Sequence, residues 1–409
     1  MNSLHTVLVS LGISILTTYA HASSQCAPLD HNVLVHQQAP LCLEGDNAPL
    51  VPVSLRFASG TWSHEPFCVA GQTKRYCTHT TSNFRNGHGL SIIANPIAAK
   101  AIASAFPASK KAQQVSEEAL EVRSIPGKGK GLVSSEPIKK GATILLDSPR
   151  IIASAQFPSH IARVQGHSLF NTIVDHLPKL DRELVLSLDK SLGGTDIENV
   201  MKTNAFACQL NDGIVGDGYM CLFPSVARIN HACRPNAHAR FIPRTMLMEI
   251  KAMRDIEAGE EISISYGKLE LKYAERQRLY KDGWNFKCTC SSCTASKYEI
   301  AGSDQRRARF AQLRNMLDNL TAETYDAQQI VAWEKEVMEI SAKEGLDTLL
   351  AGDYERLAYV HAGLGRLGDA KKWANKAKQS LMDWTIVDGG PQNEILRVEE
   401  LLGELGGPV

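Results

Sequence analysis

The chain has 409 residues, of which 44% are hydrophobic and 22% charged, so it is long enough for two or three ordinary globular domains. Lysine and arginine together number 44, as do aspartate and glutamate, and the formal net charge is zero. This balance does not favour broad electrostatic binding to nucleic acid, so we expect a protein or peptide partner and no direct nucleic-acid contact.

Residues 1–22 have the features of a secretory signal peptide. Val7–Leu16 is mostly apolar, and Ala20-His-Ala22 is a small-x-small cleavage pattern. The segment before the apolar run lacks lysine and arginine, so an apolar strand or buried helix is the alternative. The run is too short for a comfortable bilayer span, and we expect no membrane span in the mature chain.

The ten cysteines follow two different patterns. The N-terminal region, residues 23–115, holds Cys26, Cys42, Cys68 and Cys77, which are typical of two disulfide bridges. Pairing Cys26 with Cys42 and Cys68 with Cys77 is one of three possibilities, which the sequence leaves open. This region contains no catalytic constellation, and it ends in an Ala-rich helical stretch at 96–112 and a polar linker.

Short strands begin near residue 119. Leu120–Ile125 alternates apolar and polar residues as a half-buried strand does, and a glycine-rich turn follows it. Residues 158–208 are mainly helical in pattern, with breaks at Pro178 and at Gly193-Gly194. Further strands are expected at 132–135, 140–147, 151–153, 237–241, 245–252 and 261–265, and a charged surface helix at 269–281.

Residues 303–405 are helical throughout in pattern. Within them, residues 357–377 form a helix-turn-helix whose spacing is similar to one tetratricopeptide unit. An antiparallel helix pair in any bundle has the same pattern, so we expect a helical-hairpin bundle without assigning it a peptide ligand.

The Cys288-Thr-Cys-Ser-Ser-Cys293 cluster indicates a structural zinc site. Three thiols within six residues can surround one ion, but a structural zinc takes four tetrahedral ligands. Cys233 is the best candidate for the fourth, with Cys208 and Cys221 as alternatives. A reduced cluster or a disulfide is the competing interpretation.

Three further motifs are weak individually. The Gly127-Lys-Gly-Lys-Gly131 turn lets a ligand approach the backbone, but it fits neither a phosphate-binding loop nor a dinucleotide fingerprint. Asn230-His231 is by itself more often a structural turn. Tyr266 ends the strand after Gly259-Glu-Glu, and there a tyrosine usually serves packing.

In this order, the motifs resemble the SET-domain lysine methyltransferases, over residues 119–298. The SMYD-type branch and many fungal SET proteins share the helical insert and the helical C-terminal region. The resemblance implies an α+β fold: a pseudo-knotted SET-type β-fold of short strands. Its parts would be a SET domain at 119–270 with the insert at about 155–208, a post-SET zinc segment at 271–298, and a TPR-like helical domain at 299–409.

The resemblance also implies roles for individual residues. Tyr266 would be the catalytic tyrosine, better cast as an orienting group than as a strong base. Zinc would be bound by Cys233, Cys288, Cys290 and Cys293. S-adenosylmethionine would be contacted by Lys128, Gly129 and Lys130 at its methionine end, by Asn204, Asn230, His231 and Tyr266, and by Phe286 over the adenine.

The implied activity is S-adenosylmethionine-dependent N-methylation of protein lysines, on a histone or another substrate, by a monomer. Residues 154–200 contain no cysteine, so the MYND finger of the SMYD branch is missing. The family implies the nucleus or cytoplasm, whereas the leader implies the secretory pathway. A non-catalytic SET-fold binding module and a secreted effector are therefore the alternatives.

Overall fold

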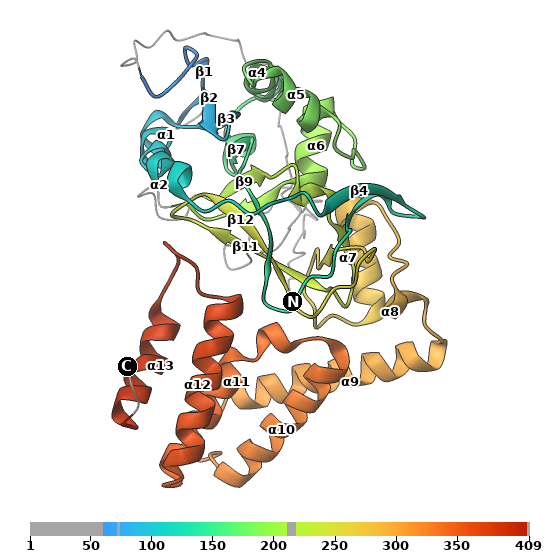
Figure 1. Ribbon diagram of the computed structural model, residues 1–409, viewed down its shortest axis with the longest axis vertical. Coiled ribbons are helices and arrows are strands. Elements are labelled where there is room, and N and C mark those ends of the chain that lie inside the picture. Colours follow the sequence, from blue (N-terminus) through green and yellow to red (C-terminus); the bar gives the residue numbers. More distant parts are fainter. Residues whose placement is uncertain (1–59, 72–73, 211–217, 407–409) are drawn as a thin grey trace, which may run out of the picture.

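The computed structural model describes residues 60–71, 74–210 and 218–406. The expected leader, Cys26 and Cys42 lie outside these ranges. In Figure 1 the strands and the helical insert form the upper part of the molecule, and the C-terminal helices lie below them.

A six-stranded sheet combines strands from before and after the expected linker. Its order is β1-β2-β3-β7-β9-β8, and β3 pairs with β7 in parallel. The strands are β1 (Cys68–Ala70), β2 (Arg75–Arg85), β3 (His88–Ala94), β7 (Ile151–Ser154), β8 (Phe206–Cys208) and β9 (Tyr219–Leu222). A disulfide joins Cys68 to Cys77 across β1 and β2. Residues on both sides of the linker therefore share one sheet.

Both faces of this sheet are covered. Alternate residues of β3 point to opposite faces, so Ile92 joins one buried cluster and Ile93 another. The helices predicted at 96–112 are α1 (Pro96–Ala103) and α2 (Phe106–Lys111), which pack on the first face. The insert covers the second face with α3 (Phe157–His160), α4 (Arg163–Asp175), α5 (Lys179–Leu186) and α6 (Asp196–Asn204).

Apart from β7, the predicted SET strands form three small sheets. A hairpin pairs β4 (Leu120–Ile125) with β5 (Gly129–Ser134). A second sheet has the order β11-β12-β6, with β11 (Ala237–Ile242), β12 (Leu247–Ala252) and β6 (Thr143–Asp147). The third pairs β10 (Asn230–His231) with β13 (Ser263–Ile264) in parallel, so the strand expected at 261–265 is shorter than predicted.

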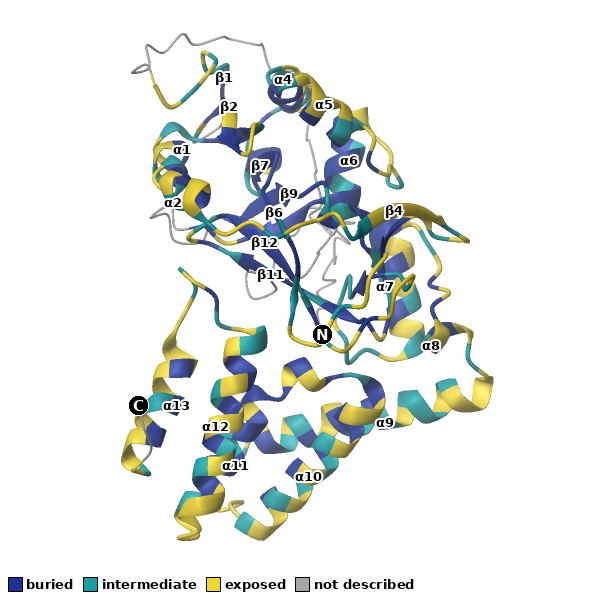
Figure 2. Cartoon of the chain, in the orientation of Figure 1, coloured by how far each residue is buried: buried dark blue, intermediate teal, exposed yellow. Residues whose placement is uncertain are grey.

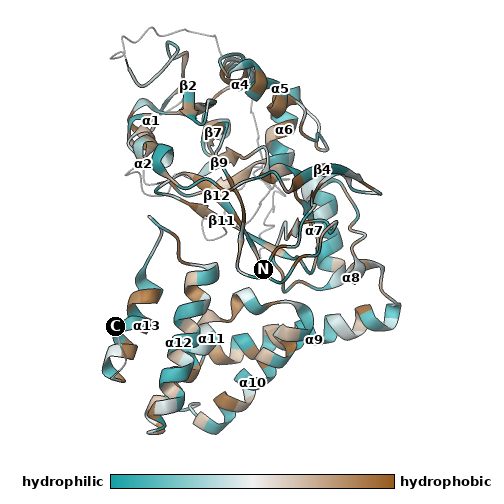
Figure 3. Cartoon of the chain, in the orientation of Figure 1, coloured by the Kyte–Doolittle hydropathy of each residue, from teal (hydrophilic) through white to brown (hydrophobic). Residues whose placement is uncertain are grey.

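The C-terminal region is all helical, as predicted. It contains α9 (Lys297–Asp318), α10 (Ala327–Glu344), α11 (Ala351–Gly363), α12 (Leu367–Trp384) and α13 (Asn393–Glu404). The predicted helix pair is α11 and α12, and its small residues Ala358, Ala370 and Ala374 are fully buried where the helices meet. Figures 2 and 3 show these helices buried and apolar on one side and exposed and polar on the other.

Polar contacts connect the helices to the SET strands. The Nζ atom of Lys251 in β12 lies 2.8 Å from Asp383 Oδ1, and the His238 ring packs on Trp384.

Within the described part of the chain, no helix combines the length and the apolar character that crossing a bilayer would need.

Candidate functional site

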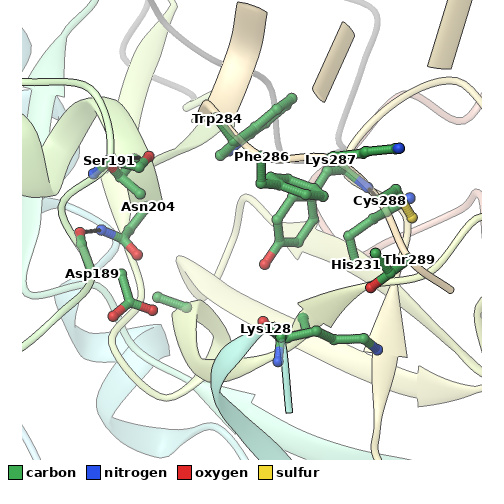
Figure 4. Close-up of a pocket in the computed structure, with 15 residues that line it drawn as sticks. Lys128, Asp189, Ser191, Asn204, His231, Trp284, Phe286, Lys287, Cys288 and Thr289 are labelled. Carbon is green, nitrogen blue, oxygen red and sulfur yellow. Dashed lines mark hydrogen bonds between the residues drawn. The ribbon is translucent and has the colours of Figure 1, made fainter. Parts of the chain in front are cut away.

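A cavity of about 220 Å³ lies where the insert, the β4–β5 turn, β10 and the segment after α7 (Tyr273–Trp284) converge. Figure 4 shows Asp189, Ser191 and Asn204 on one side, Phe286 and His231 on the other, and Lys128 below. Six of the predicted cofactor residues line the cavity: Lys128, Asn204, Asn230, His231, Tyr266 and Phe286. Gly129 and Lys130 follow Lys128 at the start of β5 and do not line it.

The glycine-rich turn brings β5 close to Asn230. Gly129 has a φ of +76°, in the left-handed region that favours glycine. A Cβ on Gly131 would lie 2.7 Å from Asn230 Nδ2, so a larger residue would push the two segments apart. The Asn230 amide donates to the carbonyl oxygen of Lys130 at 3.2 Å. Glycine is thus required at position 131 because β5 and the Asn230 segment lie so close together.

Glu261 connects the glycine-rich turn to the segment that carries Asn230. One carboxylate oxygen accepts from Asn230 Nδ2 at 2.9 Å, and the other lies 2.6 Å from Lys128 Nζ. The sequence alone gives Glu261 no specific role, although it lies in the Gly-Glu-Glu turn before Tyr266. It couples two residues that the family resemblance assigns to the cofactor.

His231 and Tyr266 form the centre of the cavity wall. The backbone N–H of Tyr266 donates to His231 Nδ1 at 3.1 Å, and the Tyr266 hydroxyl donates to the carbonyl oxygen of Ile229 at 2.7 Å. Burial lowers the pKa of His231 to about 3, which leaves the ring neutral and able to accept this bond. Burial, with the charges of Asp189 and Glu261, raises the pKa of Tyr266, so its hydroxyl remains protonated.

Aromatic side chains after α7 close one end of the cavity. Helix α7 ends at Trp284, because Asn285 adopts a left-handed conformation with a φ of 57°. Phe286 then stacks on Tyr280 at 5.4 Å between ring centroids and meets the Tyr266 ring edge-on at 6.2 Å. A flat apolar surface of this kind suits a heteroaromatic ring.

The four predicted zinc ligands lie together and are buried. Their sulfur atoms are within 4.8 Å of one another, and Cys233 Sγ lies 3.5 Å from Cys293 Sγ and 3.9 Å from Cys288 Sγ. A zinc–thiolate bond of about 2.3 Å places the sulfurs of a tetrahedral site about 3.8 Å apart, so the cluster fits a zinc ion. Cys208 and Cys221, the alternative fourth ligands, lie in β8 and β9 instead.

A buried cation lies beside this cluster. Arg276 is 1% exposed, and although burial opposes its charge, Cys233 and Cys293 raise its pKa overall. A guanidinium here offsets the negative charge of thiolates. Cys288 belongs both to the cluster and to the cavity wall, so a metal would fix the wall as well as the tail.

Several cavity residues were not predicted. They are Gly127, Asp189, Ser191, Thr203, Ala227, Trp284, Lys287, Cys288 as a wall residue, and Thr289. Thr203 and Lys287 are next in sequence to the predicted residues Asn204 and Phe286, and this adjacency could have predicted that they line the cavity. Asp189 and Ser191 have no local signal, because only the fold of the insert brings them to the cavity.

The fold and this site define a SET domain, and the sequence pattern of the SET domain family matches residues 129–267. The chain is 25% identical over 299 residues to the histone-lysine N-methyltransferase set5 of Schizosaccharomyces pombe, covering 69% of this chain and 83% of that protein. It is 29% identical over 147 residues to the human N-lysine methyltransferase SMYD2, covering 32% of this chain and 34% of that one. It thus carries a SET domain homologous to those of the SET5 and SMYD lysine methyltransferases.

Proposed function

We propose that this protein is an S-adenosylmethionine-dependent protein-lysine N-methyltransferase. The observation that carries the proposal is a single cavity that unites Tyr266 with Asn204, Asn230, His231 and Phe286. The names of the relatives, which are histone-lysine and N-lysine methyltransferases, support the same activity. Protein lysines, in histones or elsewhere, are the substrates that we propose.

The chain supplies positioning rather than acid–base chemistry. When bound, S-adenosylmethionine supplies an electrophilic methyl group on a sulfonium. Phe286 offers a face for the adenine, while Asn204 and Asn230 offer polar groups for the rest of the cofactor. Holding a lysine nitrogen in line with the methyl group can lower the barrier by several kcal/mol, and by up to about 7–11 kcal/mol in favourable cases.

The lysine must lose its proton before it can react, because its ordinary pKa is about 10.4. Exclusion of water beside Tyr266 and Trp284, together with the sulfonium charge of a bound cofactor, would disfavour the charged ammonium and so lower that pKa. Tyr266 is a poor base, since its own pKa is raised by burial. Its hydroxyl, which points to the carbonyl oxygen of Ile229, is suited to orienting the nitrogen.

Zinc would be held by Cys233, Cys288, Cys290 and Cys293, and its role would be structural. Binding would tie the segment that carries Phe286 to the segment that carries His231. This link would hold Phe286, at the aromatic end of the cavity, close to His231.

The test is transfer from tritiated S-adenosylmethionine to core histones and to a cell lysate, with the zinc-loaded full chain. We expect labelled lysine, and a loss of kcat of about a hundredfold in Tyr266→Phe with cofactor binding retained. Tyr298→Phe is the matched control, because Tyr298 is 89% exposed. Absence of transfer, or full activity in Tyr266→Phe, contradicts the proposal. Cofactor binding without any product would instead favour a binding module.

We also propose that the protein passes through an oxidising compartment. The Cys68–Cys77 disulfide supports this, because such bonds persist mainly in the secretory pathway and outside the cell. A fluorescent C-terminal fusion tests it: a secretory signal is expected, and a purely nuclear or cytosolic signal contradicts it.

A further inference from the structure

One acidic side chain reaches the cavity from the helical insert. Among the described residues that line the cavity, Asp189 is the one that carries a carboxyl group, whereas Lys128 and Lys287 carry amines. Asp189 lies in the segment between α5 and α6, on the side of the cavity away from Phe286 and His231 (Figure 4). The Asp189 carboxylate therefore lies where it can contact a ligand in the cavity, and it is not part of the buried core.

Hydrogen bonds fix the segment that carries Asp189. Asn204 Nδ2 donates to the carbonyl oxygen of Asp189 at 2.8 Å, and the Asn204 side chain is buried at the end of α6. The hydroxyl oxygen of Thr203 accepts from the backbone N–H of Ser191 at 3.1 Å. Two consecutive residues of α6 therefore hold the segment in place, and the carboxylate is preorganised at the cavity wall.

The carboxylate faces the glycine-rich turn. Asp189 Oδ2 lies 3.9 Å from the position that a Cβ on Gly129 would occupy. Lys128, in the same turn, has its amine committed to Glu261 at 2.6 Å. Among the residues that the structure describes, no cation forms a salt bridge with Asp189. The Asp189 charge acts on the nearby Arg228 guanidinium, but Arg228 Nη2 donates to the carbonyl and hydroxyl oxygens of Ser187, so the carboxylate can still accept from a cationic group in the cavity.

We propose that Asp189 binds the α-ammonium of the methionine moiety of S-adenosylmethionine and so selects cofactors with a free amino group. This assignment rests on the proposed function. The turn at Lys128 and Gly129 is the expected place of the methionine end, and Phe286, on the far side, suits the adenine. An ammonium offers three N–H donors to an acceptor-only carboxylate, whereas a sulfonium offers none.

The test removes the ammonium and the carboxylate separately and together. Calorimetry compares S-adenosylhomocysteine with its desamino analogue, in which hydrogen replaces the amine, on the zinc-loaded wild type and on Asp189→Asn. The sulfur is an uncharged thioether in both ligands, so a sulfonium charge does not contribute. We expect the wild type to prefer the amine about tenfold, the effect of one charge-assisted hydrogen bond, and Asp189→Asn to lose this preference while binding the desamino analogue unchanged.

Asp196→Asn is the matched control. It makes the same change in the same insert, at an exposed residue that does not line the cavity, and should keep the wild-type preference. Since Asp189 is itself exposed, its variant is expected to fold normally, which the thermal unfolding midpoint checks.

Three results separate the possible failures. Equal weakening of both ligands in Asp189→Asn, or no weakening, overturns the ammonium assignment. Weaker binding of S-adenosylmethionine with unchanged S-adenosylhomocysteine overturns it in favour of a sulfonium contact. If the wild type binds neither cofactor form, the proposed function fails and this inference fails with it.

Discussion

The buried carboxylate of Asp147 lies 2.7 Å from the backbone nitrogen of Ser225 and accepts its hydrogen bond. The same oxygen accepts from the backbone N–H of Val226 at 3.2 Å. These two amides begin the short 3-10 turn Val226–Arg228, which leads directly into β10 with Asn230 and His231. A side chain of β6 thereby sets the start of the segment that carries the cofactor motif.

Replacing Asp147 with alanine should therefore destabilise the SET domain. The change leaves two buried amides without an acceptor and removes a carboxylate 3.8 Å from the buried Arg150. We expect a loss of about 3 kcal/mol in the free energy of unfolding, measured by urea denaturation. Asp388→Asn, at an exposed carboxylate, is the control. A loss below about 0.5 kcal/mol would show that water replaces the carboxylate.

Glu261→Gln should weaken cofactor binding more than stability. The amide oxygen can still accept from Asn230, but the ion pair with Lys128 is lost. We expect KM for S-adenosylmethionine to rise about tenfold with little change in kcat, as initial rates would measure. Asp255→Asn breaks the exposed ion pair with Lys139 and should leave KM unchanged. A fall in kcat at constant KM would assign Glu261 a different role.

Purified protein should contain one zinc ion per chain, and Cys290→Ser should lower this content. Removal of the metal by a chelator frees the segment around Phe286 from Cys233, so the thermal midpoint should fall by about 3 °C for each kcal/mol lost. Elemental analysis and thermal unfolding measure the two effects. Cys221→Ser lies outside the cluster and should keep the zinc. Metal-free wild type with an unchanged midpoint would refute the zinc site.

The stability of the C-terminal helices should fall between about pH 5 and pH 8. Glu334 in α10 and Asp353 in α11 are fully buried near Arg356, whose Nη1 lies 2.5 Å from Glu334 Oε1. Burial, followed by the charge of Asp353, raises the pKa of Glu334 from 4.5 to about 8. The folded chain thus keeps a proton that the unfolded chain releases, and stability is lost as pH rises.

Glu334→Gln should abolish most of this pH dependence. The loss in the wild type is expected to reach about 4 kcal/mol over some three pH units, measured by denaturant unfolding at each pH. Glu339→Gln changes an exposed residue of the same helix and should retain the wild-type profile. A flat profile in the wild type would mean that Glu334 is ionised throughout this range.

Local patterns predicted most elements but not how they combine. Leu120–Ile125 forms a strand with the predicted bounds, but the expected half-burial is wrong, because Val122 is 52% exposed and its neighbours in the strand are also exposed. The stretch His88–Ala94 is buried on nearly every residue, a pattern that fits a central strand of any sheet. Its parallel pairing with β7 joins residues about 60 positions apart, and no nearby residue specifies that partner.

Adjacent acids illustrate the same limit within the site. Glu260 and Glu261 are equivalent in the sequence motif, yet their side chains point in opposite directions. Glu260 bonds Arg254 and Asn236, whereas Glu261 bonds Lys128 and Asn230. Only the pairing of this segment with β5, through the Val133–Glu261 bridge, decides which acid contacts the cavity residues Lys128 and Asn230.

The sequence by itself determined the kinds of chemistry present. The spacing of Cys288, Cys290 and Cys293 predicts a metal cluster because it is a local pattern, whereas the catalytic role of Tyr266 is what the resemblance of the ordered motifs to the SET family implies. Tertiary structure alone decided that Cys233 completes the cluster rather than Cys208 or Cys221, that Asp189 reaches the cavity, and that Glu261 contacts the cavity residues Asn230 and Lys128. Such contacts depend on how separate elements pack, which spacing along the chain does not encode.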